Sequence, residues 1–110
     1  MTVIYEGKHE KEVIAEGRTR YLSHSDNIMM VIVTFEDGPA IAPDEPHQHP
    51  HEQITYVAEG KVKFFIGDEA FELEKGDMIV VPCNTDHSVQ TLTSYVRLVD
   101  TFHPLRDDFL

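Results

Sequence analysis

Apolar and polar residues alternate in short blocks along most of this chain, a pattern typical of half-buried β-strands. The longest apolar block, Ile28–Phe35, is rich in β-branched residues and is too short for most helices, so it predicts a buried strand. Further along, Val62, Phe64 and Ile66 alternate with polar or solvent-facing positions, and Phe71 and Leu73 repeat that pattern. These two segments predict a hairpin with one face in the core and the other in water.

Glycine, proline and polar residues separate these blocks every six to twelve residues, and no segment has a convincing helical period. Residues 3–5 form a weak segment, which could be a short strand or a helical turn. The expected strands are residues 3–5, 13–15, 18–23, 28–35, 54–58, 61–66, 69–73, 77–81, 87–91 and 95–102. Nine or ten short strands without a helix predict an all-β sandwich or barrel.

The length of 110 residues predicts a single domain spanning residues 1–110. No apolar run approaches the roughly 20 residues that span a bilayer, and the first residues have no signal-peptide pattern, so we expect a cytoplasmic protein. The single cysteine, Cys83, cannot form an internal disulfide, in agreement with a reducing compartment. We expect Cys83 to act as a small buried apolar residue.

The formal net charge is −11, with 20 acidic and nine basic residues. Such a charge argues against nucleic acid or an anionic membrane as a partner. An anionic small-molecule ligand would also be repelled by the whole-molecule field. A local cation or a metal ion would then have to overcome that repulsion.

Histidines gather in the segment that leads into the strand at residues 54–58. His47, His49 and His51 share one parity with Gln53, so in an extended chain they would point to the same side. Pro50 favours that extended backbone at His49. Imidazole is the commonest protein ligand of first-row divalent metals, and His87 is the natural candidate for a further donor. Taken alone, however, histidines in a polar loop are as often simply solvated.

The spacing of these residues resembles the two motifs of the cupin superfamily. The first motif has two histidines one residue apart, then a glutamate and a glycine, and the corresponding positions are His47, His49, Gln53 and Gly60. The second has a glycine, a proline, usually another glycine, and a histidine, and the corresponding positions are Gly76, Pro82, Asn84 and His87. This resemblance implies a double-stranded β-helix, or jelly-roll barrel. It also implies one divalent transition metal, of unknown identity among Ni, Zn, Fe and Mn, bound by His47, His49, Gln53 and His87.

Two residues depart from the cupin motifs. Asn84 replaces a glycine, a mild change because asparagine tolerates left-handed backbone. Gln53 replaces the usual glutamate, so all four donors would be neutral and the metal would keep its full charge. Such a centre would be a strong Lewis acid and a good host for an anion, and it is less suited to oxygenase chemistry. His51 is the alternative to Gln53 as a ligand. Otherwise it would lie outside the coordination sphere of the metal.

The C-terminal segment resembles the end of the small KdgF-type cupins of pectin and alginate breakdown. In that family an aspartate, a phenylalanine and an arginine line the pocket, and the corresponding residues are Asp100, Phe102 and Arg106. The resemblance implies an isomerase-like enzyme that linearises 4,5-unsaturated uronates to their open-chain keto form. Asp100 would be the general acid/base, Arg106 would bind the sugar acid, and Phe102 would form the apolar wall. It also implies a homodimer.

Two other functions remain open at this stage. One is a sugar-acid-binding cupin without turnover, and the other is a cupin dioxygenase or lyase that acts on another small acid. Arg18 and Arg20 share one parity, so both could reach the barrel interior or both could lie on the surface. The closing Phe109 and Leu110 are candidates for docking against the barrel.

Overall fold

The computed structural model describes residues 1–110 and consists of nine β-strands with two single-turn 3₁₀ helices. The strands are β1 (Glu12–Ala15), β2 (Arg18–His24), β3 (Met29–Phe35), β4 (Glu52–Glu59), β5 (Lys61–Ile66), β6 (Glu69–Glu74), β7 (Met78–Val81), β8 (His87–Thr91) and β9 (Val96–His103). The 3₁₀ helices are η1 (Glu6–Lys8) and η2 (Asp107–Phe109). No helix has the length and apolar character needed to cross a bilayer.

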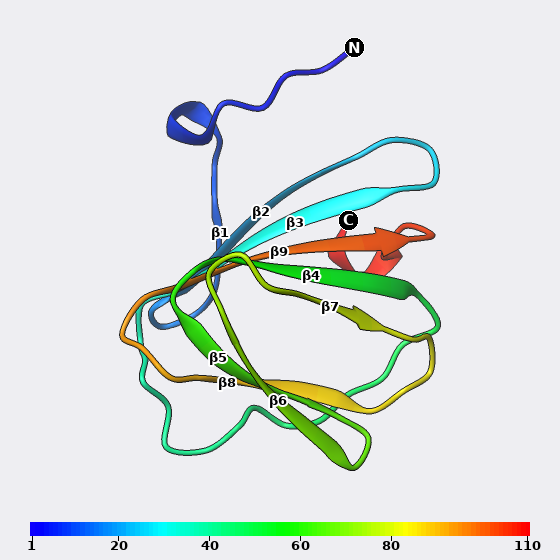
Figure 1. Ribbon diagram of the computed structural model, residues 1–110. Helices are drawn as coiled ribbons and strands as arrows, with labels where there is room; N and C mark the ends of the chain where they lie inside the picture. The colour runs from blue at the N-terminus through cyan, green and yellow to red at the C-terminus, as the bar shows by residue number, and fades with distance from the viewer.

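The strands form two antiparallel sheets that face each other (Figure 1). One sheet has six strands in the order β1-β2-β3-β9-β4-β7, and the other has three in the order β6-β5-β8. Residues far apart in sequence therefore become neighbours, because β9 lies between β3 and β4. The all-β jelly-roll architecture expected from the sequence is confirmed.

The inward faces of the two sheets form an apolar core at one end of the barrel. Five buried side chains make up its main cluster: Phe35, Val57, Val62, Val96 and Leu98. A smaller cluster of Met29, Val31 and Phe102 lies against the C-terminal segment through Leu105 and Phe109. Hydrocarbon therefore fills one part of the interior, and the polar residues described below occupy the other.

The register between β4 and β9 decides which side chains share that interior. Gln53 pairs with Phe102, Thr55 with Asp100, and Val57 with Leu98. Because side chains alternate along a strand, all six of these residues point to the same, inner side of the sheet. The inner face thus changes from polar to apolar along a single pair of strands.

Two expectations from the sequence are wrong, and a third holds only in part. Residues 3–5 form no strand, and the N-terminal segment extends away from the sheets in Figure 1. Phe71 lies on the inner face of β6, because it pairs with the buried Phe64, but its exposed fraction is 42% since β6 is an edge strand. Cys83 is exposed rather than buried, since it lies in the turn between β7 and β8.

Asn84 in that same turn has a φ of 56°, in the left-handed region. Its backbone N–H donates to the carbonyl oxygen of His49 at 2.7 Å. Asparagine is one of the few side chains that tolerate this backbone conformation, which explains why it can stand where the motif has glycine. The turn is thereby tied to the histidine-bearing segment.

Candidate metal centre

The segment between β3 and β4 carries the first histidines and runs beside β8 (Figure 1). Its backbone N–H groups at Ala40, Asp44 and His47 donate to carbonyl oxygens of Thr91, Val89 and His87 at 3.0 Å each. His87 in turn donates to the carbonyl of His47 at 2.9 Å. These bonds extend the three-stranded sheet by one irregular strand and place His47 directly opposite His87.

The structure brings His47, His49 and His87 together. One ligand atom from each lies within 4.8 Å of the other two, close enough for all three to bind one ion. His49 and His87 are buried, whereas His47 is exposed. Burial is the main cause that lowers the pKa of all three imidazoles below that of ordinary histidine. Neutral imidazoles are the form that binds a metal.

Hydrogen bonds fix which ring nitrogens face the centre of this cluster. Nδ1 of His49 lies 3.0 Å from the carbonyl oxygen of His51, and Nδ1 of His87 lies 2.9 Å from that of Thr85. A carbonyl oxygen only accepts, so both Nδ1 atoms carry the proton, and each neutral ring presents the Nε2 lone pair inward. Nε2 of His87 is buried without any hydrogen-bond partner. A buried nitrogen whose lone pair has no hydrogen-bond partner is well suited to bind a cation.

Gln53 contributes a fourth potential donor. Its side chain is buried on the inner face of β4, and Oε1 lies 2.9 Å from Nε2 of His49. With the proton of His49 on Nδ1, this contact sets two lone pairs against each other. A cation between them would turn the repulsion into two favourable contacts. The three-histidine cluster with this amide oxygen can therefore hold a metal ion.

Asp100 lies on β9, directly opposite Thr55 on β4. The Thr55 hydroxyl donates to Oδ1 of Asp100 at 2.6 Å, and Gln53 Nε2 donates to the Thr55 oxygen at 2.8 Å. Burial raises the pKa of Asp100 to about 6, against the opposing effects of the Thr55 hydrogen bond and the Arg106 charge. Some of its surface faces the cavity, yet protein surrounds the carboxyl group closely.

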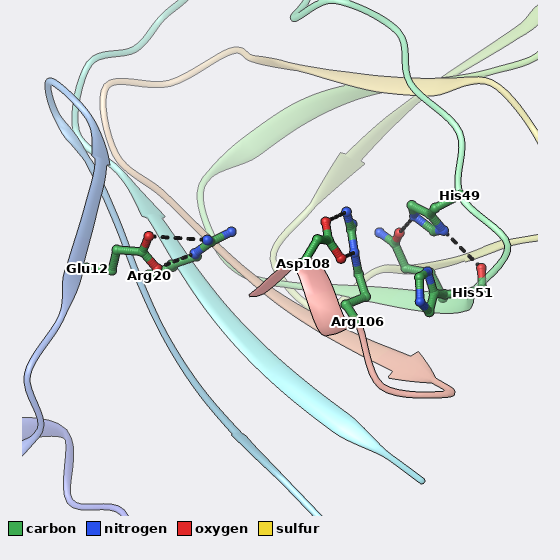
Figure 2. Close-up of polar contacts among 7 residues, drawn as sticks. Glu12, Arg20, His49, His51, Arg106 and Asp108 are labelled. Atoms are coloured by element: carbon green, nitrogen blue, oxygen red, sulfur yellow. Dashed lines mark hydrogen bonds and ion pairs between the residues drawn. The ribbon is translucent and has the colours of Figure 1, made fainter. Parts of the chain in front are cut away.

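Arg106 lies between the two aromatic residues of the C-terminal region. Its guanidinium carbon is 5.2 Å from the ring centre of Phe102 and 4.0 Å from that of Phe109. Two of its nitrogens bind the carboxylate of Asp108 at 2.6 and 3.2 Å (Figure 2). Its charge also contributes to the lowered pKa of the three histidines, so it lies close to the cluster.

Arg18 and Arg20 line the same cavity as the histidines, so they face the barrel interior. Arg20 binds Glu12 through two nitrogens (Figure 2). Its guanidinium carbon also lies 4.0 Å from the ring centre of Phe109. Arg18 is paired with Asp37 and Asp44 at 3.0 and 2.8 Å. Both arginines therefore have carboxylate partners within the chain.

The cavity has a volume of about 190 Å³ and contains His47, His87, Gln53, Asp100, Phe102 and Arg106 among its lining residues. His51 is outside the three-histidine cluster. Its ring lies 5.5 Å from that of His49, and its backbone carbonyl receives the His49 proton. The sequence had left His51 open as a ligand, and in this geometry its main-chain oxygen orients one.

The sequence reasoning missed two residues of this region. Thr55 shares the parity of Gln53, so the alternation along β4 could have placed it in the interior. Phe109 was considered only as a docking residue, and its position between two guanidinium groups has no local signal in the sequence. That contact depends on β2 and the C-terminal segment meeting in space.

Comparison with known proteins adds independent information. Residues 31–102 match the family model described as "Cupin domain". The pectin degradation protein KdgF of Dickeya dadantii (strain 3937) is 39% identical over 101 residues, which cover 90% of this chain and 89% of that protein.

Solved structures agree with that match. The structure of KdgF from Halomonas sp. superposes with a TM-score of 0.90 at 32% identity, covering 100% of this chain and 99% of that one. An RmlC-like cupin from Shewanella frigidimarina NCIMB 400 gives a TM-score of 0.87 at 31% identity, covering 97% and 94% of the two chains. Each comparison spans the sheets that carry the histidines, Gln53 and Asp100.

Proposed function

This chain is a cupin of the KdgF type, and from that premise we propose that it linearises 4,5-unsaturated uronates with the help of a divalent metal. The product would be the open-chain keto form. The observation that carries the proposal is a cluster of three imidazoles and the Gln53 amide beside a cavity that is also lined by a carboxyl group of raised pKa and a guanidinium group. A relative named for pectin degradation supports a sugar acid as substrate.

The reaction is an isomerisation, so no atom is added or lost. A base takes the proton of the anomeric hydroxyl, the bond between C1 and the ring oxygen breaks, and an aldehyde forms at C1. The former ring oxygen becomes an enol at C5. That enol then loses its proton while C4 gains one, which gives the ketone. Both steps need a group that accepts a proton and returns one near neutral pH.

Asp100 is the group to which we assign these proton transfers. Burial raises its pKa to about 6, so both its protonated and its ionised forms are accessible near neutral pH. Arg106 would bind the substrate carboxylate, because its planar fork matches two carboxylate oxygens. Phe102, buried beside it, would form the apolar wall on which the sugar ring packs.

His47, His49, His87 and Gln53 would hold the metal ion. When bound, the ion would act as a Lewis acid that stabilises negative charge on substrate oxygens. Because all four donors are neutral, the ligands would leave its charge uncompensated, which favours an anionic substrate in a protein of net charge −11. The location we assign is the cytoplasm, where the lone exposed Cys83 would stay reduced.

The test is to incubate the purified, metal-loaded protein with freshly prepared unsaturated monouronate. The ultraviolet absorbance of the conjugated double bond should fall faster than in buffer, and NMR should show the open-chain keto acid. Asp100→Asn should bind the metal normally and lower kcat roughly 10²- to 10⁴-fold, the usual contribution of a general acid/base. Absence of acceleration by protein with confirmed bound metal rejects the proposal.

The same experiment separates the two rival functions. Heat of uronate binding in a calorimeter, without any change of the sugar's NMR spectrum over hours, would identify a binding protein without turnover. Oxygen uptake by the iron-loaded protein in the presence of a small acid would identify a dioxygenase.

A further inference from the structure

Thr55 belongs to neither cupin motif, yet it lies between two residues of the proposed site. It is fully buried in the middle of β4, with Gln53 two residues before it and Asp100 directly opposite on β9. Its hydroxyl contacts both of these side chains, at 2.8 and 2.6 Å. These two hydrogen bonds satisfy the buried hydroxyl and link the proposed metal ligand to the proposed acid/base.

The directions of the two hydrogen bonds follow from the chemistry of the partners. An amide nitrogen only donates and a carboxylate only accepts. The Thr55 oxygen therefore accepts from Nε2 of Gln53, and its single proton goes to Oδ1 of Asp100. The hydroxyl has only one proton, so it cannot also donate a hydrogen bond to an acceptor on the Gln53 side.

This arrangement fixes the orientation of the Gln53 amide. With Nε2 held by Thr55, Oε1 faces Nε2 of His49 at 2.9 Å, on the side where the histidine lone pairs converge. A flipped amide would turn its oxygen toward the Thr55 oxygen, whose proton is already engaged with Asp100. The flip would then leave an acceptor unpaired at Thr55 and place N–H groups, which cannot bind a metal, toward the histidines.

The same hydroxyl also acts on Asp100. It occupies one lone-pair direction of Oδ1 and holds the carboxyl group against β4. Oδ2 is left as the oxygen without a hydroxyl donor from Thr55. Proton transfer is then assigned to Oδ2.

We propose that Thr55 is a positioning residue that aims the Gln53 oxygen at the metal position and fixes Asp100 for proton transfer. The Asp100 half of this role rests on the proposed function. The Gln53 half does not, because it concerns metal binding alone. Threonine suits the role, since its β-branched side chain has few rotamers and holds the hydroxyl steadily.

The test measures metal affinity without any substrate. Zn²⁺ is titrated into metal-free protein in competition with a chromophoric chelator. Thr55→Val keeps the shape and removes the hydroxyl, and it should weaken Zn²⁺ binding about 10- to 100-fold, as is typical when a partner of a metal ligand is lost. Thr55→Ser keeps the hydroxyl and should bind Zn²⁺ close to the wild-type value.

The matched control uses the Gln53→Glu background. The two oxygens of a carboxylate are equivalent, so its orientation cannot be wrong, and adding Thr55→Val there should weaken Zn²⁺ binding less than it does in the Gln53 background. Circular dichroism of the metal-free variants verifies that each is folded. An equal loss in both backgrounds, wild-type affinity in Thr55→Val, or equally weak binding by Thr55→Ser would overturn the role of Thr55.

A second measurement needs no variant at Thr55. The side-chain amide of Gln53, identified by the NMR signal that is lost in Gln53→Glu, should exchange its protons slowly with solvent because Thr55 holds it in the interior. Rapid exchange in the metal-free protein would overturn the proposal even if Thr55→Val does not fold. If the wild-type protein binds no Zn²⁺, both this inference and the metal centre fail. If the Zn²⁺ results hold but uronate is not converted, only the proposed function fails.

Discussion

Arg106 shows how a single residue can combine several forces. Its flat guanidinium group lies on the rings of Phe102 and Phe109, and its edge binds a carboxylate. Stacking leaves the edge free for hydrogen bonds, so the aromatic rings orient the group without using its donors. A lysine has the same charge, but it has neither the flat surface nor the paired N–H donors of a guanidinium group.

Arg106→Lys is therefore expected to raise KM for the uronate about 10- to 100-fold, because one hydrogen bond to a charged group contributes about 1.5–3 kcal/mol. The effect on kcat should be smaller, since the bond is made to a part of the substrate that does not react. Steady-state kinetics measure both constants. Arg97→Lys is the matched control, because Arg97 binds Glu6 and Tyr21 outside the cavity. An equal rise of KM in both variants would contradict this role of Arg106.

The sequence predicts individual residues well where a fixed spacing carries the information. His47, His49 and His87 were expected near one another and do form a cluster. The roles of Thr55 and Phe109 depend on partners that lie more than 40 residues away in the chain, at Asp100 and Arg20. Such contacts follow from the register of β4 on β9 and from the path of the C-terminal segment, which no local pattern contains.

At the scale of elements, the short helix η2 brings an acidic residue to the arginine of the site. Asp108 lies two residues after Arg106, and its exposed carboxylate binds the Nε and Nη2 edge of the guanidinium group, where a substrate carboxylate could also bind. The two carboxylates would compete. The C-terminal segment would thus compete with an anionic ligand bound at Arg106.

Asp108→Asn should lower KM for the uronate by up to about fivefold, because an exposed ion pair contributes up to about 1 kcal/mol. Asp107→Asn removes the same charge one residue earlier without touching the Arg106 pair, so it isolates the effect of direct competition. Kinetics of the two variants at one ionic strength provide the measurement. Equal changes of KM in both variants would show that KM responds to the overall electrostatic field of the protein and not to direct competition at Arg106.

The pattern of apolar residues predicted nine strands close to their observed bounds, including β1, whose four residues are all exposed. It failed at residues 3–5, where the apolar residues have no strand to pair with. The histidines lie in the extended segment before the strand, as β4 begins only at Glu52. The histidine segment is held by backbone bonds to β8, and the sequence does not encode that pairing as a hydrophobic pattern.

For the whole molecule, the main consequence of the site is that it joins the two sheets. His87 belongs to the three-stranded sheet and His47 lies beside it, whereas Gln53 belongs to the six-stranded sheet. A bound ion would cross-link them in the folded state only. It should therefore stabilise the protein in proportion to its affinity.

Saturation with Zn²⁺ at 100 times its dissociation constant should add about 2.7 kcal/mol to the free energy of unfolding. In a domain of this size that corresponds to a rise of Tm of roughly 10–20 °C. Calorimetry with Zn²⁺ and with a chelator measures the difference. His87→Ala should lose the shift, and His24→Ala should keep it because His24 lies at the exposed end of β2. A shift that survives in His87→Ala would contradict the assigned ligand.

The outer face of the six-stranded sheet carries exposed apolar residues in two rows. Met30, Thr101, Ile54 and Val80 lie side by side across four strands, and Ile32, Val99, Tyr56 and Met78 form the next row. Ile54, Val80 and Met78 have exposed fractions of 45, 65 and 63%. Apolar rows of this extent are unusual on a surface that stays in water.

We expect two copies of the chain to pair through these rows, in keeping with the homodimer implied by the family resemblance. Light scattering after gel filtration should give the mass of a dimer. Ile54→Asp should shift it toward the monomer, whereas Phe71→Asp should not, because Phe71 is exposed on the other sheet. A monomeric wild-type protein at micromolar concentration would refute the expectation.

The pairing of Gln53 with Phe102 and of Thr55 with Asp100 also limits how the gene can change. Deleting or inserting one residue within β4 or β9 would turn every later side chain of that strand to the opposite side of the sheet. A change at the start of β4 would remove Gln53 and Thr55 from the interior, and one at the start of β9 would remove Asp100. Length variation among descendants of this chain should therefore accumulate in residues 36–46 and before β1, while these two strands keep a constant residue count.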